Sequence, residues 1–301
     1  MRELVAELWR IGRFTPVARY QRFGYVCGGL LIISGVFHTV VYLVDGGSLE
    51  GPVSWRKPIV FGLSFGITLM TVTWLMNFLR SKGSVRRLLL GILAVASVGE
   101  VFLISMQRWR GVASHFNEDT NFDAMVFALM GILVGLVALV IVAITVLVFA
   151  RVDAPATLAF AVRVGLGLML VSQAVGVQMI AQGGNTFGDH GALKVPHAFT
   201  LHAVQVLAVL ALLLLTSDFV ERQRVKVLAI GAAGYTALIS STMVQTYSGR
   251  SPLDLGILAS TLVLLGLGFL AVSVGVALRA VAARHSLREP APDRTDAPRS
   301  P

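Results

Sequence analysis

Three ionisable residues, His38, Glu100 and His202, lie inside long apolar stretches of the sequence. An ionisable side chain in the hydrocarbon core of a bilayer is costly unless it is paired, so such residues are candidates for a function. His202 follows Pro196 by six residues, and proline suits the first turn of a helix, so His202 is expected about 9 Å below that turn. Two imidazoles and a carboxyl group at that depth suit metal or haem ligation, proton transfer or acid–base catalysis.

The composition indicates the class of protein. Of the 301 residues, 55% are hydrophobic and only 14% are charged, and several apolar runs are long enough to span a bilayer. The single cysteine, Cys27, excludes an internal disulfide framework and argues against a thiolate metal cluster. In a membrane protein the net charge of +9 is first a signal of topology, so the expected partner is the lipid bilayer and no nucleic acid is expected.

The apolar runs predict an all-α fold, a polytopic transmembrane helical bundle of about eight spans within residues 24–281. Residues 1–23 have apolar side chains at helical spacing and several arginines, so they are expected to form an amphipathic interfacial helix on the membrane. Residues 282–301 are rich in Pro, Asp and Arg and are expected to form a disordered tail. The spans are expected at residues 24–44, 58–79, 88–106, 124–150, 157–181, 196–215, 227–247 and 253–278.

The distribution of positive residues predicts the orientation of the bundle. If the N-terminus lies in the cytoplasm, most of the 25 Lys and Arg residues fall in cytoplasmic segments and only a few fall in the outer loops. Cytoplasmic loops of membrane proteins carry such an excess of positive charge. Both termini are therefore expected in the cytoplasm.

Two pairs of glycines predict close packing of helices. Gly62 and Gly66 lie four residues apart in the second expected span, and Gly131 and Gly135 have the same spacing in the fourth. Small residues at this spacing let two helix backbones approach one another. Helix packing is therefore the favoured interpretation of both pairs.

The ionisable residues are expected at one level in the outer half of the bilayer. His38 precedes Asp45, at the outer end of the first span, by seven residues. Glu100 precedes Gln107, at the outer end of the third span, by the same interval. Seven residues correspond to about 10 Å of helix, close to the depth expected for His202. This pattern predicts a polar cavity open to the extracytoplasmic side. Its candidate residues are His38, Lys57, Glu100, Gln107, Arg110, His115, Asn117, Gln178, His197, His202 and Gln205.

Three motifs carry a resemblance to a known family. Residues 55–58 (WRKP), residues 107–117 (QRWRGVASHFN) and residues 197–205, with the pattern HxxxxHxxQ, resemble the motifs of a family of uncharacterised bacterial multi-pass membrane proteins. The resemblance runs from about the second span to the sixth and implies a location in the bacterial cytoplasmic membrane. In the family an acidic residue and an arginine precede the first histidine of the last motif, whereas here Ala192 and Lys194 occupy those places, which argues against a fixed acid–histidine pair there. The resemblance implies no activity.

The first functional hypothesis is a redox centre that holds a haem or a divalent metal. His38 and His202 come from different spans and could bracket a porphyrin, and together with Glu100 they would suit zinc or non-haem iron. His197 and His202 are five residues apart, about 140° around a helix, so they do not form a local pair of ligands. The sequence contains no HExxH, HxxxH or CxxC motif.

The second hypothesis is proton-coupled movement of a small solute. The three ionisable residues would form a proton relay, and Arg56, Lys57 and Arg108 would form a mouth that attracts anions. The sequence shows no inverted repeat and no pair of broken helices, features that are common in transporters. The ligand in this case is a small molecule that enters from the extracytoplasmic side.

The third hypothesis is extracytoplasmic chemistry on a lipid. His115 or His202 would act as the base and Ser114 as the nucleophile. Against each functional hypothesis stands a structural one. Ser114 and Asn117 could cap a loop by bonding to the backbone, and the buried ionisable residues could form a hydrogen-bonded network that holds the helices together.

Overall fold

The structure is a computed structural model that describes residues 9–16 and 18–286. Eight of the helices in this part of the chain are long and apolar enough to cross a membrane, which confirms the predicted multi-pass helical architecture. They are α2 (Arg19–Asp45), α3 (Arg56–Leu75), α4 (Gly83–Trp109), α5 (Asn121–Ala150), α6 (Ala156–Ala181), the pair α7 (Lys194–Leu201) and α8 (Ala203–Leu215), α9 (Glu221–Tyr247) and α10 (Ile257–Ser286).

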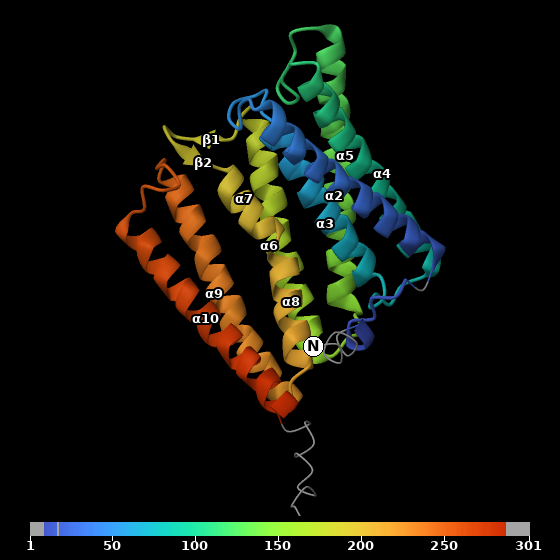
Figure 1. The fold of residues 1–301 in the computed structure, drawn as a ribbon, viewed down its shortest axis with the longest axis vertical. Helices are drawn as coiled ribbons and strands as arrows, with labels where there is room; N and C mark the ends of the chain where they lie inside the picture. The colour runs from blue at the N-terminus through green and yellow to red at the C-terminus, as the bar shows by residue number, and fades with distance from the viewer. Residues whose placement is uncertain (1–8, 17, 287–301) are drawn as a thin grey trace, which may run out of the picture.

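The helices form two groups that meet in the middle of the bundle. Helices α2 to α5 pack against one another on one side, and α9 and α10 form a long antiparallel pair on the other (Figure 1). Helices α6, α7 and α8 lie between them, and α6 contacts α5 of the first group as well as α9 of the second. A residue on α7 or α8 can therefore face either group.

One predicted pair of glycines makes a close helix contact. A Cβ atom on Gly62 of α3 would lie 2.8 Å from the backbone nitrogen of Gly35 on α2, so the two backbones touch and leave no room for a side chain. Gly66 of α3 approaches Gly28, which also lies on α2, in the same way. The prediction for Gly131 and Gly135 was wrong, because a Cβ atom on either would meet no atom within 4 Å among the described residues.

The ends of the bundle differ in part from the sequence prediction. Helix α2 begins at Arg19, so residues 19–23 of the expected interfacial helix belong to the first membrane helix. Residues 9–11 are helical and residues 1–8 lie outside the described part of the chain. At the other end α10 continues to Ser286, beyond the expected boundary at residue 281, and the rest of the expected tail is not described.

A small β-ribbon interrupts the all-α pattern in the loop between α6 and α7. Strand β1 (Thr186–Phe187) pairs antiparallel with β2 (Gly191–Ala192), with Thr186 opposite Ala192. The sequence did not predict these strands. The ribbon places Gly191 against the end of α9, where a Cβ atom would collide with the carbonyl oxygen of Thr246.

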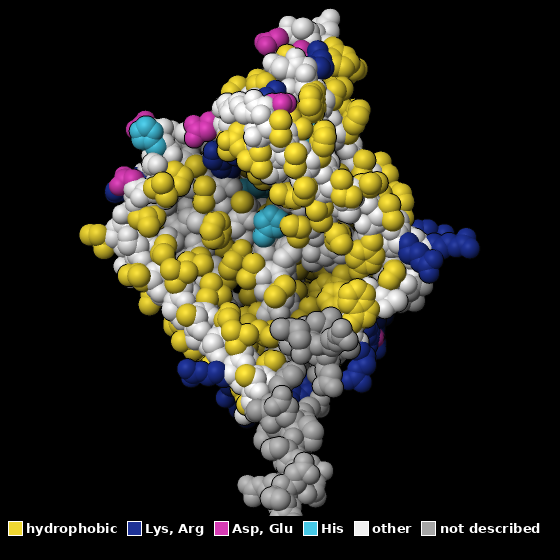
Figure 2. All heavy atoms as spheres, viewed as in Figure 1, with side chains coloured by type: hydrophobic (Ala, Val, Ile, Leu, Met, Phe, Trp, Pro, Cys, Tyr) yellow, Lys and Arg dark blue, Asp and Glu magenta, His cyan; other side chains and the backbone are white. Residues whose placement is uncertain are grey.

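The surface fits a membrane environment. Hydrophobic side chains cover the middle of the molecule, Lys and Arg gather mainly at the end where α10 finishes, and Asp and Glu are found mainly around the opposite loops (Figure 2). Large apolar side chains are exposed on the sides of the bundle, for example Leu43 at 73% and Leu264 at 72%. In water such a surface would be unfavourable, whereas lipid chains would cover it.

Candidate functional site

Glu100 is the most unusual polar residue of the bundle. It lies on α4, it is fully buried, and neither carboxylate oxygen has a hydrogen-bond partner among the described residues. The nearest ionisable group is the imidazole of His115, whose Nε2 atom is 3.7 Å from Oε1 of Glu100. This distance is too long for a hydrogen bond, although the two groups face each other. A buried carboxyl group without partners is rare and calls for an explanation.

A short chain of polar contacts extends from Glu100 towards the loops. His115 Nδ1 lies 2.9 Å from Ser114 Oγ, and Lys57 Nζ donates to the same oxygen over 3.4 Å. Lys57 can only donate, while the Ser114 hydroxyl can accept from Lys57 and either accept from Nδ1 or donate to it. When it donates, the neutral imidazole carries its proton on Nε2, the atom that faces Glu100. We call Lys57, Glu100, Ser114 and His115 the Glu100 cluster.

The loop between α4 and α5 brings His115 back over the bundle. Gly111 has a φ of +74° just after the end of α4, and Phe116 has a φ of +56°, a conformation that is uncommon for a residue other than glycine. These two turns fold the loop inward, and His115 packs on the ring of Phe61 of α3 with 5.7 Å between ring centroids. Asn117 stabilises the loop, since its amide donates to the Ala113 carbonyl over 2.9 Å. The capping interpretation of Asn117 therefore fits its contacts.

His115 lies outside the membrane helices and is neutral at pH 7. Burial and the nearby charge of Lys57 lower its pKa from the usual 6.5 to about 4. Its side chain is 24% exposed, so protons from the aqueous side reach the ring, while Glu100 behind it has no exposure. His115 is thus placed between solvent and a buried carboxyl group.

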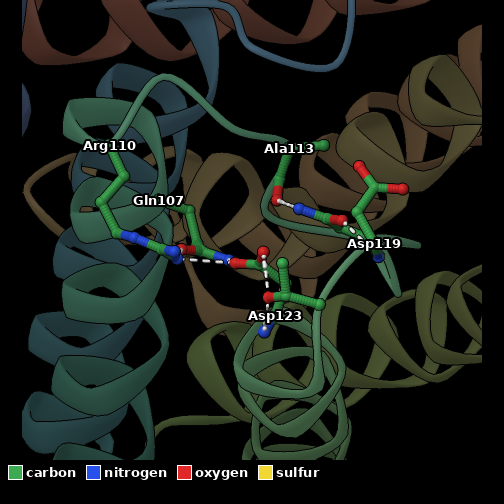
Figure 3. Close-up of polar contacts among 7 residues, drawn as sticks. Gln107, Arg110, Ala113, Asp119 and Asp123 are labelled. Carbon is green, nitrogen blue, oxygen red and sulfur yellow. Dashed lines mark hydrogen bonds and ion pairs between the residues drawn. The ribbon is translucent and has the colours of Figure 1, made fainter.

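A second polar group at the end of α4 is fully paired (Figure 3). Asp123, at the start of α5, accepts from Gln107 Nε2 over 2.8 Å and from Arg110 Nη1 over 2.6 Å. Arg110 also donates to Gln107, and Thr120 caps the first turn of α5 and bonds the second oxygen of Asp123 over 2.7 Å. Gln107 and Arg110 therefore join two helices. Asp123 was missed, although a threonine three residues before an acidic residue is a helix-start signal.

His38 belongs to an aromatic group and not to the Glu100 cluster. Its Nδ1 atom bonds the Ser34 carbonyl over 2.8 Å, and its Nε2 atom accepts from the indole nitrogen of Trp109 over 3.1 Å. Both ring nitrogens are thus occupied. Trp55 packs beside this pair, with its ring centroid 5.2 Å from that of Trp109.

The sixth membrane segment has one irregular residue, His202, but stays a single span, because the His202 N–H donates to the Ala198 carbonyl and its carbonyl accepts from the Val206 N–H, each over 3.2 Å. Helix α7 ends at Leu201 and α8 begins at Ala203, and His202 between them has a φ of −93° and a ψ of 7°. The sequence predicted one continuous span here. The sequence has no glycine or proline next to His202. The Thr200 hydroxyl donates to the Pro196 carbonyl over 2.6 Å, and such bonds tend to bend helices.

The two histidines of this segment contact different helices. His197 Nδ1 lies 3.0 Å from Ser172 Oγ of α6, whereas His202 Nε2 lies 3.0 Å from Ser64 Oγ of α3. Their separation around the helix was expected from the five-residue spacing. His202 therefore connects the α7–α8 segment to the first helix group, α2 to α5.

One face of α3 links His202 to the Glu100 cluster. Lys57, Phe61, Ser64 and Thr68 follow the spacing i, i+4, i+7 and i+11, which places them on one side of the helix. Their contacts are Ser114, His115, His202 and Gln205, in the same order. We call Lys57, Ser64 and Thr68 the α3 polar stripe. Gln205 reaches Thr68 only over 3.5 Å, and its Oε1 atom has no partner among the described residues.

The predicted site residues thus separate into several groups. Lys57, Glu100 and His115 form the Glu100 cluster, and His202 and Gln205 adjoin the α3 polar stripe. The others have partners elsewhere. These are His38, Gln107, Arg110, Asn117, His197, and Gln178, which accepts a hydrogen bond from Tyr247. Ser64, Thr68 and Ser172 were missed, although the spacing of Ser64 and Thr68 from Lys57 is visible in the sequence.

A metal site receives no support from this arrangement. The described residues contain no group of three or more His, Cys, Asp or Glu side chains that could hold one metal ion. His38, Glu100 and His202 instead face Trp109, His115 and Ser64 respectively. The haem or metal hypothesis therefore stays a prediction.

The fold and the site indicate a multi-pass helical membrane protein with a buried carboxyl group that has no hydrogen-bond partner among the described residues. The chain matches no family model, no curated protein and no solved structure. The resemblance of its motifs to a bacterial membrane family is thus still an expectation.

Proposed function

We propose that the protein is a proton-coupled transporter of a small polar solute. The observation that carries this proposal is Glu100, a fully buried carboxyl group on a membrane helix with no hydrogen-bond partner among the described residues. In many transporters the substrate site is formed by discontinuous helices near the middle of the membrane, because the broken ends expose backbone groups to the ligand. The irregular residue His202 keeps both of its helical backbone hydrogen bonds, so here the solute would meet side chains, among them His202 and Ser64, and not open helix ends.

The solute path runs along the α3 polar stripe. Lys57 lies at the outer end of α3, and Thr68 lies eleven residues further, about 16 Å along the axis. Between them the hydroxyl groups of Ser64 and Thr68, the imidazole of His202 and the amide of Gln205 offer donors and acceptors. The Gln205 side chain lies beside both Thr68 and His202, so a solute there would meet several polar groups at once.

Glu100 is the proton-binding group of this transporter. The Ser114 hydroxyl passes its proton to Nδ1 of His115 and takes one from the outer solution, while the Nε2 proton of His115 passes to Glu100. Glu100 later releases this proton to the cytoplasmic side, and a proton shift from Nδ1 to Nε2 resets His115, so each group gains and loses one proton. The carboxylate without partners is what such a role requires, since hydrogen bonds or an arginine would fix its charge. His115 returns to the neutral state that it has at pH 7.

The orientation follows the positive-inside rule. Both termini lie in the cytoplasm, and the Glu100 cluster faces the extracytoplasmic side. The gathering of Lys and Arg at the end where α10 finishes supports this orientation (Figure 2). A reporter enzyme fused after Arg284 tests it, because activity of the reporter outside the cytoplasm would reverse the proposed topology.

The transport proposal is tested in proteoliposomes loaded with a pH-sensitive dye. Amino acids, dicarboxylates, phosphate and monosaccharides are added outside in turn, and solute-dependent acidification of the interior is recorded. We expect at least one class to drive proton uptake and Glu100→Gln to abolish it. The matched control is Glu118→Gln, which changes an exposed carboxylate in the loop between α4 and α5 and should leave uptake unchanged. Proton uptake that persists in Glu100→Gln would contradict the proposed role.

The order of atoms in the Glu100 cluster also favours a second candidate function, acyl transfer by Ser114. Ser114 Oγ, His115 and Glu100 follow one another as nucleophile, base and acid do in serine hydrolases, with Lys57 beside the nucleophile. In this reaction Ser114 Oγ bonds the carbonyl carbon of a lipid ester while its proton passes to His115 Nδ1. The ester C–O bond then breaks, and the leaving alcohol takes the proton.

A covalent probe separates the two functions. A fluorophosphonate forms a stable bond with an activated serine, so labelling that is lost in Ser114→Ala would support acyl transfer. Ser248→Ala is a suitable control, because Ser248 is exposed and bonds only the Val244 carbonyl. If Ser114 is not labelled while solute drives proton uptake, the cluster acts in proton transfer alone.

A further inference from the structure

A groove between α2 and α4 opens to the surrounding lipid. It encloses about 590 Å³, within the usual range for ligand pockets. Its sides are apolar, and Ile33 and Phe102 are each 64% exposed, so a ligand can enter only from the membrane. His38 and Trp109 close its outer end.

Two polar groups at or beside this groove make no hydrogen bond or ion pair with the described residues. The hydroxyl of Ser105 lines the groove, is buried, and makes no hydrogen bond with the described residues. Arg108, one turn further along α4, makes no hydrogen bond or ion pair with the described residues, and its guanidinium lies 3.7 Å from the centre of the Trp55 ring. Trp55 in turn packs on Trp109, so a free positive charge lies beside the outer end of the groove.

We propose that this groove binds one anionic glycerophospholipid of the outer leaflet. The phosphate pairs with Arg108, an ester carbonyl accepts a hydrogen bond from Ser105, and one acyl chain lies against Ile33 and Phe102. Two tryptophans at the level of the headgroups suit this position, since aromatic rings are enriched at the membrane interface. The ligand is anionic because Arg108 has no carboxylate partner in the described chain. The proposal is independent of the transport function, since none of these groups belongs to the Glu100 cluster or to the α3 polar stripe.

Native mass spectrometry of the full-length protein in detergent tests the proposal. Phosphatidylglycerol or phosphatidylcholine with the same acyl chains is titrated, and retained lipid is counted per protein molecule. We expect one phosphatidylglycerol to be retained with about fivefold higher affinity than phosphatidylcholine, as one Arg–phosphate contact near the membrane surface would give. Arg108→Gln should remove this preference, and Arg108→Lys should keep most of it.

Two further variants distinguish a specific site from general attraction to positive charge. Arg87→Gln removes a charge from the opposite end of the same helix and should leave the preference unchanged. Ile33→Trp fills the groove from its exposed side and should lower retention of the lipid without any change at Arg108. Equal retention of the two lipids by the unchanged protein, or a preference that survives in both Arg108→Gln and Ile33→Trp, would overturn the proposal.

Discussion

Glu100, within α4, and Asp123, at the start of α5, are two buried carboxyl groups with opposite hydrogen-bond surroundings. Asp123 accepts hydrogen bonds from Gln107, Arg110 and Thr120, so every charge and donor around it is matched. Glu100 is equally buried and has no hydrogen bond within the described part of the chain. A paired carboxylate holds a structure together, whereas an unpaired one weakens it and must be retained for another reason. The contrast therefore separates a carboxyl group that joins two helices from one that is available for the proposed proton transfer.

The largest expected effect is on stability and comes from the paired group. Asp123→Ala leaves Arg110 and Gln107 without their acceptor and removes one partner of Thr120 at the start of α5. Several bonds are lost together, although the Arg110 guanidinium is 38% exposed and regains water, so we expect this variant to have the lowest unfolding midpoint of those considered. Unfolding by sodium dodecyl sulfate, followed by circular dichroism, measures the loss. An unchanged midpoint would mean that the paired group does not hold α4 and α5 together.

The second prediction concerns the pH dependence of stability. The pKa of His115 is about 4 in the folded protein and 6.5 when unfolded, so between these values the unfolded chain binds more protons. The contribution of the neutral imidazole is complete above pH 6.5 and is lost as the pH falls to 4, by roughly 3 kcal/mol at most. Melting temperatures of the unchanged protein and of His115→Asn across this range measure it. The difference between the two proteins should shrink as the pH falls, and parallel curves would contradict the burial of a neutral His115.

The smallest effect on stability is expected from the α3 polar stripe. Ser64→Ala removes one hydrogen bond to His202, which costs about 1 kcal/mol or less. Transport should fall much more than stability, because the Ser64 hydroxyl lies beside His202, on the proposed path of the solute. Thr71→Val is the matched control, since Thr71 bonds only its own helix at Ile67 and is not on the stripe. Equal transport by the two variants would remove the stripe from the solute path.

The membrane architecture could be predicted from the sequence because lipid requires long apolar helices, and eight such runs are visible. The packing of Gly62 against α2 followed from spacing alone, but the same spacing at Gly131 and Gly135 led to no contact. A pair of small residues permits close packing and does not require it. The sequence thus establishes which contacts are possible better than which are made.

The site was harder to predict because its contacts join residues of a loop, such as His115, to residues of helices that are distant in the sequence. His115 was among the predicted residues, but its position beside Glu100 depends on the turns at Gly111 and Phe116, which bend the loop back. The expected layer of His38, Glu100 and His202 did not become one site, because residues at equal depth can face different neighbours. Depth follows from sequence position, whereas direction depends on how helices rotate when they pack.

The most direct test compares Glu100→Gln with Asp123→Asn in one preparation. If Glu100 is retained for proton coupling, Glu100→Gln should keep its melting temperature within about 3 °C, equivalent to roughly 1 kcal/mol, and should lose solute-driven proton uptake. Asp123→Asn should melt at a lower temperature, and the fraction that stays folded should still take up protons. A destabilised Glu100→Gln that still takes up protons would contradict the account, because Glu100 would then be the structural residue.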